Sequence, residues 1–314
     1  MRSYGGKALV AAIVLALGAC ASPPGAADTI VVYSAQEQAL AQAWARGFTT
    51  DTGIEVILRD GADLALADRL IAEGAETPAD AFLTENAPAL DLVADAGLLA
   101  DLDRATLDQV PSRYRPPSGR WIGVAVRTPA FVYDTAELSQ AELPAGLLEL
   151  AQPQWQGRWG AGFFGADFQA VVTGLLAARG PELTRTWLRG VRANATSVLD
   201  PQQAVADGIM AGGVISHDDW TGPGRTALHP FPDATATVSG GAVLRAGEQQ
   251  RAAQRFLAFV AGPQGQTILR ASTSAKYPVI AAPMPSDPRL GALDPALATR
   301  LMTEAGLLPA APPR

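Results

Sequence analysis

The stretch Thr29–Val56 has the sequence TIVVYSAQEQALAQAWARGFTTDTGIEV and decides the fold class of the chain. Its first seven residues are rich in β-branched side chains, which is typical of a short buried strand. Leu40, Trp44 and Phe48 then recur at the spacing of one helix face, and Gly53 follows them as a stop signal. An alternating apolar pattern resumes at once, so the stretch predicts a strand, a helix and a second strand in succession.

The same alternation of strand-like and helix-like segments continues through the chain. The segments ADAFLTE, IGVAVRTPAFVYD and GGVISHDD have the apolar character of strands. Between the last two of them, FQAVVTGLLAARG, PELTRTWLRGV and PQQAVADGIMAG have apolar residues at helical spacing. Strands that alternate with helices in this way are typical of an α/β protein with a parallel-rich sheet.

The length and composition fit a globular protein of one or two domains. The 314 residues are enough for two domains, or for one large domain with a substantial core. Hydrophobic residues make up 48% and charged residues 18%, so extensive disorder is not expected. The net charge of -7, with no run of Lys or Arg, argues against nucleic acid as a partner, because nucleic-acid binders display a basic face. A cationic ligand fits this charge balance better.

The N-terminal residues have the pattern of an export signal. Basic residues precede an apolar run, Ala8–Leu17, that is too short to span a bilayer, and small residues lead to Cys20. The order Leu, Gly, Ala, Cys resembles a bacterial lipobox, in which the cysteine is lipidated; the alternative is an ordinary signal peptide that ends at a cysteine by chance. We expect residues 1–19 to be a lipoprotein signal peptide and 20–28 a lipid-anchored linker. The protein would then be periplasmic or at the cell surface, anchored to the membrane through Cys20.

Acidic residues follow three of the predicted strands. Glu37 follows the first strand, Glu85 follows ADAFLT, and the pair Asp218 and Asp219 follows GVISH. Ligands of parallel α/β sheets bind at the carboxyl ends of the strands, so a fold that faces two sheets together is expected to bring these side chains together. Carboxylates that meet repel one another and raise at least one pKa, unless a cation neutralises them. The pattern therefore predicts a cation site.

These residues leave the identity of the cation open. Carboxylates with a few waters suit manganese, calcium, magnesium or ferrous iron, and the nearby imidazole of His217 favours a transition metal. An organic cation such as a polyamine or thiamine is an alternative. Adjacent residues of a strand point to opposite faces, so we expect one of Asp218 and Asp219 to face the site.

Several stretches resemble the periplasmic ferric-iron-binding proteins of ABC importers, which belong to the bacterial extracellular solute-binding proteins. The likeness begins with Thr29–Val56 and continues through LADRLIAEGAETPADAFLTENAPALDLVADAGLLADL, RTPAFVYD, QQAVADGIMAGGVISHDDW, TVSGGAVLRAGEQQRAAQRFLAFVAGPQGQ and AKYPV. The resemblance implies a two-lobed periplasmic-binding-protein fold of type II, with two mixed sheets joined by a hinge of extended crossovers. It implies a lobe 1 of residues 29–125 plus 240–285 and a lobe 2 of residues 126–239 plus 286–314.

The resemblance also implies which residues bind the metal. The family holds ferric iron with a histidine, a glutamate and two adjacent tyrosines. The corresponding residues here are all acidic: Glu37 at the histidine, Glu85 at the glutamate, and Asp218 and Asp219 at the tyrosines. Carboxylates are hard oxygen ligands, as phenolates are, but weaker donors to ferric iron.

Other residues are expected to line the ligand site. Arg127 corresponds to an arginine at the hinge of a family in which many members bind an anion beside the iron. Asp167 falls where the family pattern has a small hydroxyl residue at a helix N terminus; an acidic side chain there disfavours a bound anion and can cap the helix instead. His217 and Trp220 flank the acidic pair, and Tyr33 ends the first strand. Each of these three is a candidate for the wall of the cleft, the alternative being ordinary packing.

The resulting prediction is a lipid-anchored solute-binding component of an ABC importer. It captures iron or another metal cation in an interlobe cleft and delivers it to a membrane permease, as a monomer without a catalytic cofactor. The alternatives are a binder of an organic cation, or a sensor or partner-binding lipoprotein outside transport. Paired carboxylates also occur in glycoside hydrolases and in metal sites that activate water, but no GxSxG or HExxH motif and no reactive cysteine supports an enzyme.

Overall fold

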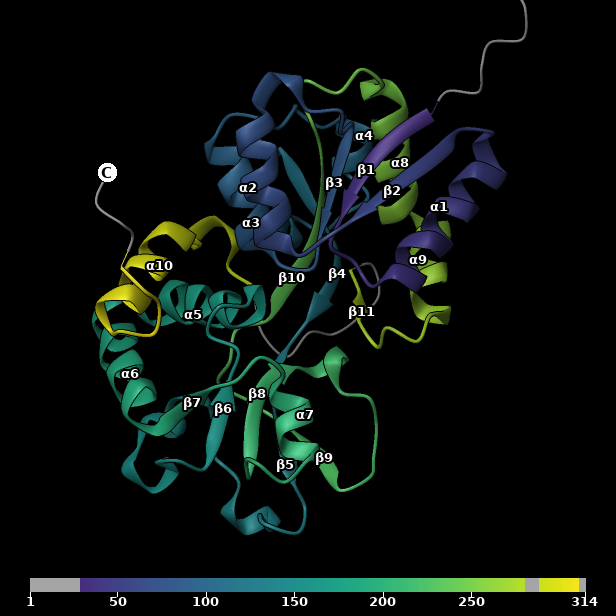
Figure 1. Cartoon of the computed structure of the whole chain (residues 1–314). Coiled ribbons are helices and arrows are strands. Elements are labelled where there is room, and N and C mark those ends of the chain that lie inside the picture. The colour runs from purple at the N-terminus through teal and green to yellow at the C-terminus, as the bar shows by residue number, and fades with distance from the viewer. Residues whose placement is uncertain (1–28, 280–287, 311–314) are drawn as a thin grey trace, which may run out of the picture.

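The computed structural model describes residues 29–279 and 288–310. The predicted signal peptide, the linker and Cys20 lie outside the described residues. Within them, two sheets with their helices form two units, one above the other in Figure 1. We refer to the unit with the six-stranded sheet as the first lobe and to the unit with the five-stranded sheet as the second lobe. Among the residues described, no helix combines the length and apolar character that a membrane crossing requires.

The first lobe is built on a mixed sheet. Its strands are β1 (Thr29–Ser34), β2 (Glu55–Asp60), β3 (Ala81–Thr84), β4 (Trp121–Arg127), β10 (Thr237–Val243) and β11 (Tyr277–Pro278). They lie in the order β11-β4-β10-β3-β1-β2. The strands β1, β2 and β3 are parallel, whereas β10 is antiparallel to β3 and β4, and β11 is antiparallel to β4. The carboxyl ends of β1 and β3 therefore lie at one edge of the sheet, facing the second lobe.

Helices flank the sheet of the first lobe (Figure 1). They are α1 (Gln38–Thr52), α2 (Asp63–Glu73), α3 (Ala87–Asp95), α4 (Arg104–Leu107), α8 (Gln250–Ala261) and α9 (Pro263–Ala271). The first of them confirms the helix predicted from the sequence, because Leu40, Trp44 and Phe48 are buried on its inner face. Gly53 ends this helix with a φ of 75°, a left-handed conformation that glycine adopts without steric cost.

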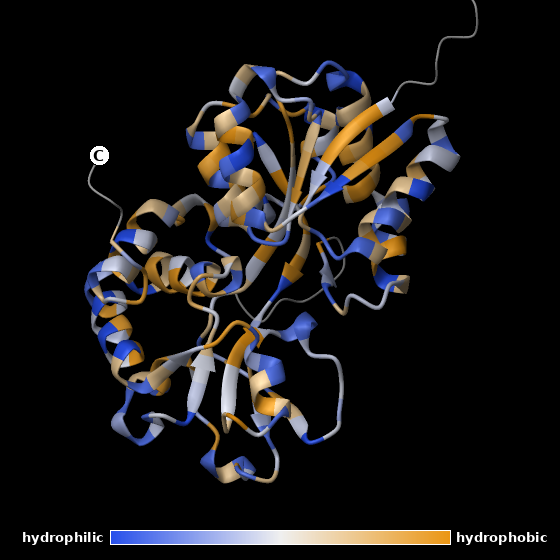
Figure 2. Cartoon of the chain, viewed as in Figure 1, coloured by the Kyte–Doolittle hydropathy of each residue, from blue (hydrophilic) through white to orange (hydrophobic). Residues whose placement is uncertain are grey.

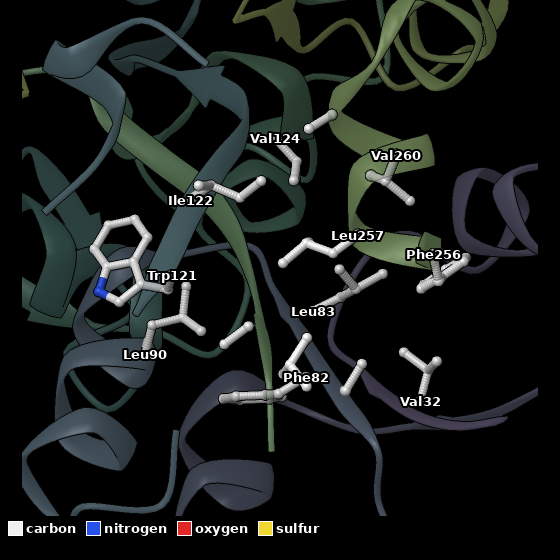
Figure 3. Packing of buried hydrophobic residues seen from close by; sticks show 14 of the residues in the cluster. Val32, Phe82, Leu83, Leu90, Trp121, Ile122, Val124, Phe256, Leu257 and Val260 are labelled. Carbon is white, nitrogen blue, oxygen red and sulfur yellow. The ribbon is translucent and has the colours of Figure 1, made fainter. Parts of the chain in front are cut away.

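The core of the first lobe lies between the sheet and its helices. Leu83 from β3 lies beside Leu257 from α8, and Trp121 from β4 lies beside Leu90 from α3 (Figure 3). Burial of each large apolar side chain stabilises the fold by roughly 1.5–3 kcal/mol. Figure 2 shows the same arrangement along the ribbon, with hydrophobic residues concentrated on the strands and hydrophilic residues on the loops.

The second lobe has its own mixed sheet and core. Its strands are β5 (Pro129–Asp134), β6 (Trp159–Ala161), β7 (Ala195–Ser197), β8 (Gly212–Ser216) and β9 (Thr226–Pro230), in the order β7-β6-β8-β5-β9. The strand β6 is parallel to β7 and β8, whereas β5 is antiparallel to β8 and β9. Its helices are α5 (Ala166–Arg179), α6 (Pro181–Asn194), α7 (Pro201–Ala206) and α10 (Pro295–Glu304). Phe131, Trp155, Trp159 and Trp187 are buried together in its core.

Short 3-10 helices complete the described elements. They are η1 (Gly74–Glu76), η2 (Ser112–Tyr114), η3 (Gln140–Glu142), η4 (Leu147–Ala151), η5 (Pro153–Trp155), η6 (His217–Asp219) and η7 (Leu290–Ala292). The acidic pair predicted as a ligand site therefore lies in η6, directly after β8, and not on the strand itself.

The chain passes between the lobes along extended segments. It leaves the first sheet at Arg127, the last residue of β4, and enters the second at Pro129, the first residue of β5, so Thr128 alone separates the two strands. It returns from β9 to β10 between Pro230 and Thr237. After β11 the C-terminal segment brings α10 against α5 and α6 in the second lobe. The prediction of an α/β fold with two mixed sheets is confirmed.

Candidate functional site

Residues of both lobes border one pocket at the carboxyl ends of the strands. Loops after β1 and β3 and the segment before β11 contribute from the first lobe, and η6 contributes from the second. The pocket has a volume of about 300 Å³ and is lined by Ala35, Gln36, Glu37, Glu85, Asp218, Asp219, Ser274 and Lys276. All four residues predicted as metal ligands are in this set, although they are up to 182 positions apart in the sequence, from Glu37 to Asp219.

Arg127 lies beside this pocket and contacts four carboxylates. Its side chain is fully buried, and its guanidinium nitrogens lie 2.8 Å from Asp218, 2.8 Å from Asp219 and 2.7 Å from Asp167. Glu85 approaches the same guanidinium to 3.6 Å. Burial opposes the charge of Arg127, but the surrounding carboxylates outweigh it and raise the arginine pKa well above its usual value.

Lys276 is the second cation of the site. Its side chain is 1% exposed, and Nζ lies 2.5 Å from Oε1 of Glu85 and 4.0 Å from Oδ2 of Asp218. It also donates to Oε1 of Gln36 at 3.1 Å, while Nε2 of Gln36 donates to the carbonyl of Thr84. The prediction that a bound cation neutralises these carboxylates is wrong in this respect. Two side chains of the protein itself, Arg127 and Lys276, are the cations that pair with them.

The two adjacent aspartates differ in their acidity. Burial raises the pKa of Asp218, but Arg127 and Lys276 outweigh it and hold the pKa below its ordinary value. Burial and the neighbouring carboxylates raise the pKa of Asp219 to about 7, against the opposing effect of Arg127. Both residues line the pocket, contrary to the expectation that only one would, because the strand ends at Ser216 and the rule of alternating faces does not apply to a 3-10 turn.

A network of buried polar groups lies behind Glu85. Asp63, in the first turn of α2, accepts from the backbone N–H of Glu85 at 2.9 Å and from Nδ2 of Asn86 at 3.0 Å. Burial raises the pKa of Asp63 to about 7. Asn86 also donates to Asp167 at 2.9 Å and thereby connects the first lobe to the second. Asp167 therefore does not cap α5, as the sequence allowed; the N-cap position is Gly165, and Asp167 bonds to Arg127 and Asn86 instead.

His217 lies beside the pocket rather than among its lining residues. Its Nδ1 accepts from the backbone N–H of Thr128 at 3.1 Å, and its Nε2 lies 3.2 Å from the carbonyl of Ala275. Its ring stacks on Tyr277, with ring centroids 4.5 Å apart. Burial lowers the pKa of this histidine, which favours the neutral ring that the Nδ1 contact requires. His217 thus joins the second lobe to the hinge and to the segment before β11.

The structure places the predicted aromatic wall residues away from the pocket. The ring of Tyr33 is buried in the first lobe, its hydroxyl donates to Glu73 at 3.0 Å, and Arg69 lies over the ring. Trp220 packs in the second lobe and donates to Oγ1 of Thr226 at 3.2 Å. Neither Tyr33 nor Trp220 lines the pocket that contains Glu85 and the acidic pair.

The acidic side chains line one pocket, but they do not point toward a single position where a metal ion could bind. In the described part of the chain, no three His, Cys, Asp or Glu side chains are grouped so as to hold a metal ion. The carboxylates are turned toward Arg127 and Lys276 instead. Of the four predicted ligands, Glu37 and Asp219 are exposed, and Glu37 lies in the loop after β1.

Sequence reasoning missed Lys276, Gln36 and Asp63. Lys276 carried a signal that could have revealed it, since it and Lys7 are the two lysines of a chain that otherwise uses arginine. A single lysine in the part that follows the predicted signal peptide indicates a position where a compact ammonium group is needed. The aspartate carried no comparable signal, because acidic residues at the start of a helix are common.

The fold and the site define a bacterial extracellular solute-binding protein. The chain belongs to this family, whose model matches residues 76–295. The prediction of a binding protein rather than an enzyme is confirmed by this membership.

Individual relatives agree with the family assignment. The chain is 42% identical to the Fe(3+)-binding periplasmic protein of Serratia marcescens, over 98% of each chain. It is 32% identical to the major ferric iron-binding protein of Neisseria meningitidis serogroup B, over 85% of each chain. Among solved structures, iron-bound HitA from Pseudomonas aeruginosa is 31% identical and superposes with a TM-score of 0.77, covering 89% of this chain and 99% of that chain. The predicted resemblance and the two-lobed type II fold are thereby confirmed.

Proposed function

We propose that this protein is the extracytoplasmic solute-binding component of an ABC importer and captures iron in the pocket between its lobes. Glu37 and Glu85 would bind the ion from the first lobe, and Asp218 and Asp219 from the second. The iron would then pass to a permease in the cytoplasmic membrane. We propose residues 29–125 plus 240–285 and residues 126–239 plus 286–314 as the extents of the two functional units. This division counts residues 126–127 and 237–239 with the second unit, although they end β4 and begin β10 in the sheet of the first lobe.

One observation carries the proposal. Carboxylates from both lobes border the same pocket, and relatives that cover nearly the whole chain are named as ferric-iron-binding proteins. An ion bound by donors on both lobes couples binding to lobe closure, which is how a two-lobed binding protein signals that it is loaded. Carboxylate oxygens are hard donors suited to a highly charged cation.

Arg127 has a positioning role in this proposal. Its nitrogens hold Asp218 and Asp219 at 2.8 Å each and thereby fix both carboxylates at the border of the pocket. The N–H groups of the guanidinium already donate to Asp167, Asp218 and Asp219, so they are not available to bind an anion. We therefore propose that iron binds here without an accompanying anion on Arg127.

The remaining elements of the proposal concern location and assembly. We infer that Cys20 is lipidated after removal of residues 1–19, and that residues 20–28 tether the folded lobes to the membrane. The protein would act as a monomer, because delivery to a permease needs the outer faces of both lobes to be free.

A second candidate is the capture of an organic cation. A hollow of about 510 Å³ in the second lobe is bordered by Asp167, Asp200 and Asp219 together with apolar residues such as Phe168 and Leu199. This volume is within the range of small-molecule sites, and its acidic and apolar lining suits an amine with a hydrocarbon chain.

The test is a binding series on protein stripped of metal. Iron supplied as ferric nitrilotriacetate is expected to appear in native mass spectra as one ion per chain and to raise the thermal unfolding midpoint, because a ligand that binds only the native state stabilises it. Glu85→Gln and Asp218→Asn should each weaken binding at least about tenfold, the equivalent of roughly 1.4 kcal/mol. Glu248→Gln, an exposed acidic residue outside the pocket, is the matched control and should bind as the wild type does.

The same series separates the candidates. A midpoint that rises with spermidine and not with iron would favour the organic-cation function. Iron binding that is unchanged in the Glu85 and Asp218 variants would place the iron site elsewhere. A wild-type protein that responds to neither cation would support the non-transport alternative.

A further inference from the structure

Lys276 occupies the place in the pocket that a bound cation would take. Its ammonium lies between Glu85 of the first lobe, at 2.5 Å, and Asp218 of the second, at 4.0 Å. The amide oxygen of Gln36 lies 3.1 Å away. These three oxygens come from three separate segments, so the ammonium is surrounded by donors much as a metal ion would be.

The side chain is unusual for a lysine in its burial. It is 1% exposed, whereas lysines are almost always solvated unless they are paired. An ammonium group is a compact point charge on a flexible stem, and it can leave a site without rearranging the backbone. The buried guanidinium of Arg127 differs in this respect, because three aspartates bind its planar group and hold it in place.

A metal ion and this ammonium cannot share Glu85. An iron ion bound to Oε1 of Glu85 would lie within a few ångströms of Nζ, and two cations at that distance repel strongly in a partly buried site. Binding through Glu85 therefore requires Lys276 to move out. A site that is occupied by its own side chain binds cargo with an apparent affinity reduced by the fraction of time that it is occupied.

The charge of the cluster favours a highly charged ion as the displacing cation. When all four are ionised, the carboxylates Glu85, Asp167, Asp218 and Asp219 share the single guanidinium of Arg127 once Lys276 has left. Their combined formal charge is then about -3, and the proposed ligand Glu37 adds a further negative charge, so a trivalent ion neutralises more of the charge than a divalent one does. The displacement of one ammonium costs the same for either ion, so the trivalent ion gains more from the exchange.

The segment that carries Lys276 is held on both sides. Ala275 has a φ of 55°, a left-handed conformation that residues other than glycine seldom adopt, and its carbonyl lies 3.2 Å from Nε2 of His217. Tyr277 stacks on the His217 ring. The backbone on either side of Lys276 is thereby fixed to the second lobe, and the lysine stem directs the ammonium into the pocket.

We propose that Lys276 is a tethered competitor of the cargo, occupying the cation position in the unloaded protein and being displaced by a trivalent ion. The inference rests on the proposed function, because it assumes that the ion binds through Glu85. Lys276 would thereby set a threshold of affinity for the pocket, because mono- and divalent cations that bind weakly do not displace the ammonium.

The experiment follows the lysine directly. Protein labelled with ¹³C at the lysine ε carbon gives a signal for Lys276 that Lys276→Met removes and thereby assigns. Gallium(III) serves as a diamagnetic trivalent probe. Gallium is expected to move the Lys276 signal to the position of a solvent-exposed lysine, whereas magnesium and calcium at equal concentration leave it in place.

Binding to variants provides the second measurement. Lys276→Met should raise the affinity for gallium and iron at least tenfold, and that for magnesium and calcium by a similar factor, because no ion then has to displace the ammonium. Lys276→Gln, which keeps a polar group, is the second variant in case the apolar side chain disturbs the fold. Lys276→Arg should weaken binding, since the guanidinium is larger and less easily displaced.

The outcomes distinguish this inference from the proposed function. Wild-type protein that binds gallium, seen as a raised unfolding midpoint, while its Lys276 signal stays unchanged would overturn the inference alone. Lys276→Met and Lys276→Gln proteins that bind trivalent ions no better than the wild type would also overturn it. Failure of both the wild type and Lys276→Met to bind any iron or gallium would overturn the proposed function and the inference together.

Discussion

The guanidinium of Arg127 donates from Nε to both carboxylate oxygens of Asp218 at 2.8 Å. This contact joins the last residue of β4 in the first lobe to the turn after β8 in the second. Because Thr128 alone follows before β5 begins, the contact lies at the point where the chain crosses between the lobes. Arg127 therefore offsets part of the charge of the acidic cluster and fixes the cluster at the hinge.

Replacement of Arg127 by methionine is expected to destabilise the protein severely. The substitution keeps an unbranched apolar side chain but removes the guanidinium, so the acidic residues around it lose this buried counter-ion. Removal of one partner from a buried ionic network typically costs about 3–5 kcal/mol. Urea unfolding at pH 7 measures the loss. Arg104→Met, which removes an exposed pair with Asp108, is the control and should leave the midpoint nearly unchanged. An Arg127→Met protein as stable as the wild type would mean that the cluster does not depend on this charge.

The buried carboxyl of Asp63 is expected to make stability depend on pH. Its pKa is about 7 in the folded protein and about 4 in an unfolded chain, so the folded state retains a proton that the unfolded state releases. Stability from this group is therefore complete below about pH 4 and is lost as the pH rises toward 7. The slope is at most about 1.4 kcal/mol per pH unit.

Asp63→Asn tests this dependence. The amide cannot ionise, so the free energy of unfolding of the variant should fall less steeply between pH 4 and pH 7 than that of the wild type. Urea titrations at half-unit intervals give both curves. Asp233→Asn is a useful comparison, because this aspartate also accepts from the backbone, at Leu147, but lies in the second lobe away from the acidic cluster. Parallel curves for Asp63→Asn and the wild type would show that Asp63 does not retain a proton in the folded protein.

Asp167→Ser is expected to create a response to anions. The substitution removes one carboxylate from Arg127 and puts a hydroxyl in the first turn of α5, where the free N–H groups of a helix N terminus favour negative charge. Phosphate should then raise the unfolding midpoint of the variant and strengthen its iron binding about tenfold, while the wild type shows neither effect. Isothermal titration with phosphate, in the presence and absence of iron, provides the measurement. Asp167→Asn, which removes the charge without adding a hydroxyl, separates the two contributions.

Much of the fold could be predicted from local pattern. The helix that buries Leu40, Trp44 and Phe48 has an uninterrupted apolar face and ends at a glycine, and both signals act within a few residues. The convergence of Glu85 with Asp218 and Asp219 was also predictable, because all three follow strands whose carboxyl ends meet at the pocket. Strand order was less accessible, since β10 inserts between β3 and β4 from far along the chain.

The partners of the acidic residues could not be predicted in the same way. Lys276 lies before a two-residue strand at the edge of the first sheet, and it is 191 positions from the glutamate that it contacts. No periodic pattern connects residues at that separation. Arg127 was expected to contact a ligand because of its place at the hinge, but the identity of its partners depends on how the second lobe turns toward it. The negative charge of the cluster predicted a positive partner. It could not show whether that partner is a side chain of the protein or a bound cation.

The single-residue crossing at Thr128 has a mechanical consequence for capture. A rotation about this point moves atoms in proportion to their distance from it, so the outer rims of the lobes travel far while the neighbouring carboxylates barely shift. The donor oxygens of the two lobes would thus need only a small relative shift to meet around the ion. That small shift at the pocket would correspond to a large movement at the outer faces of the lobes.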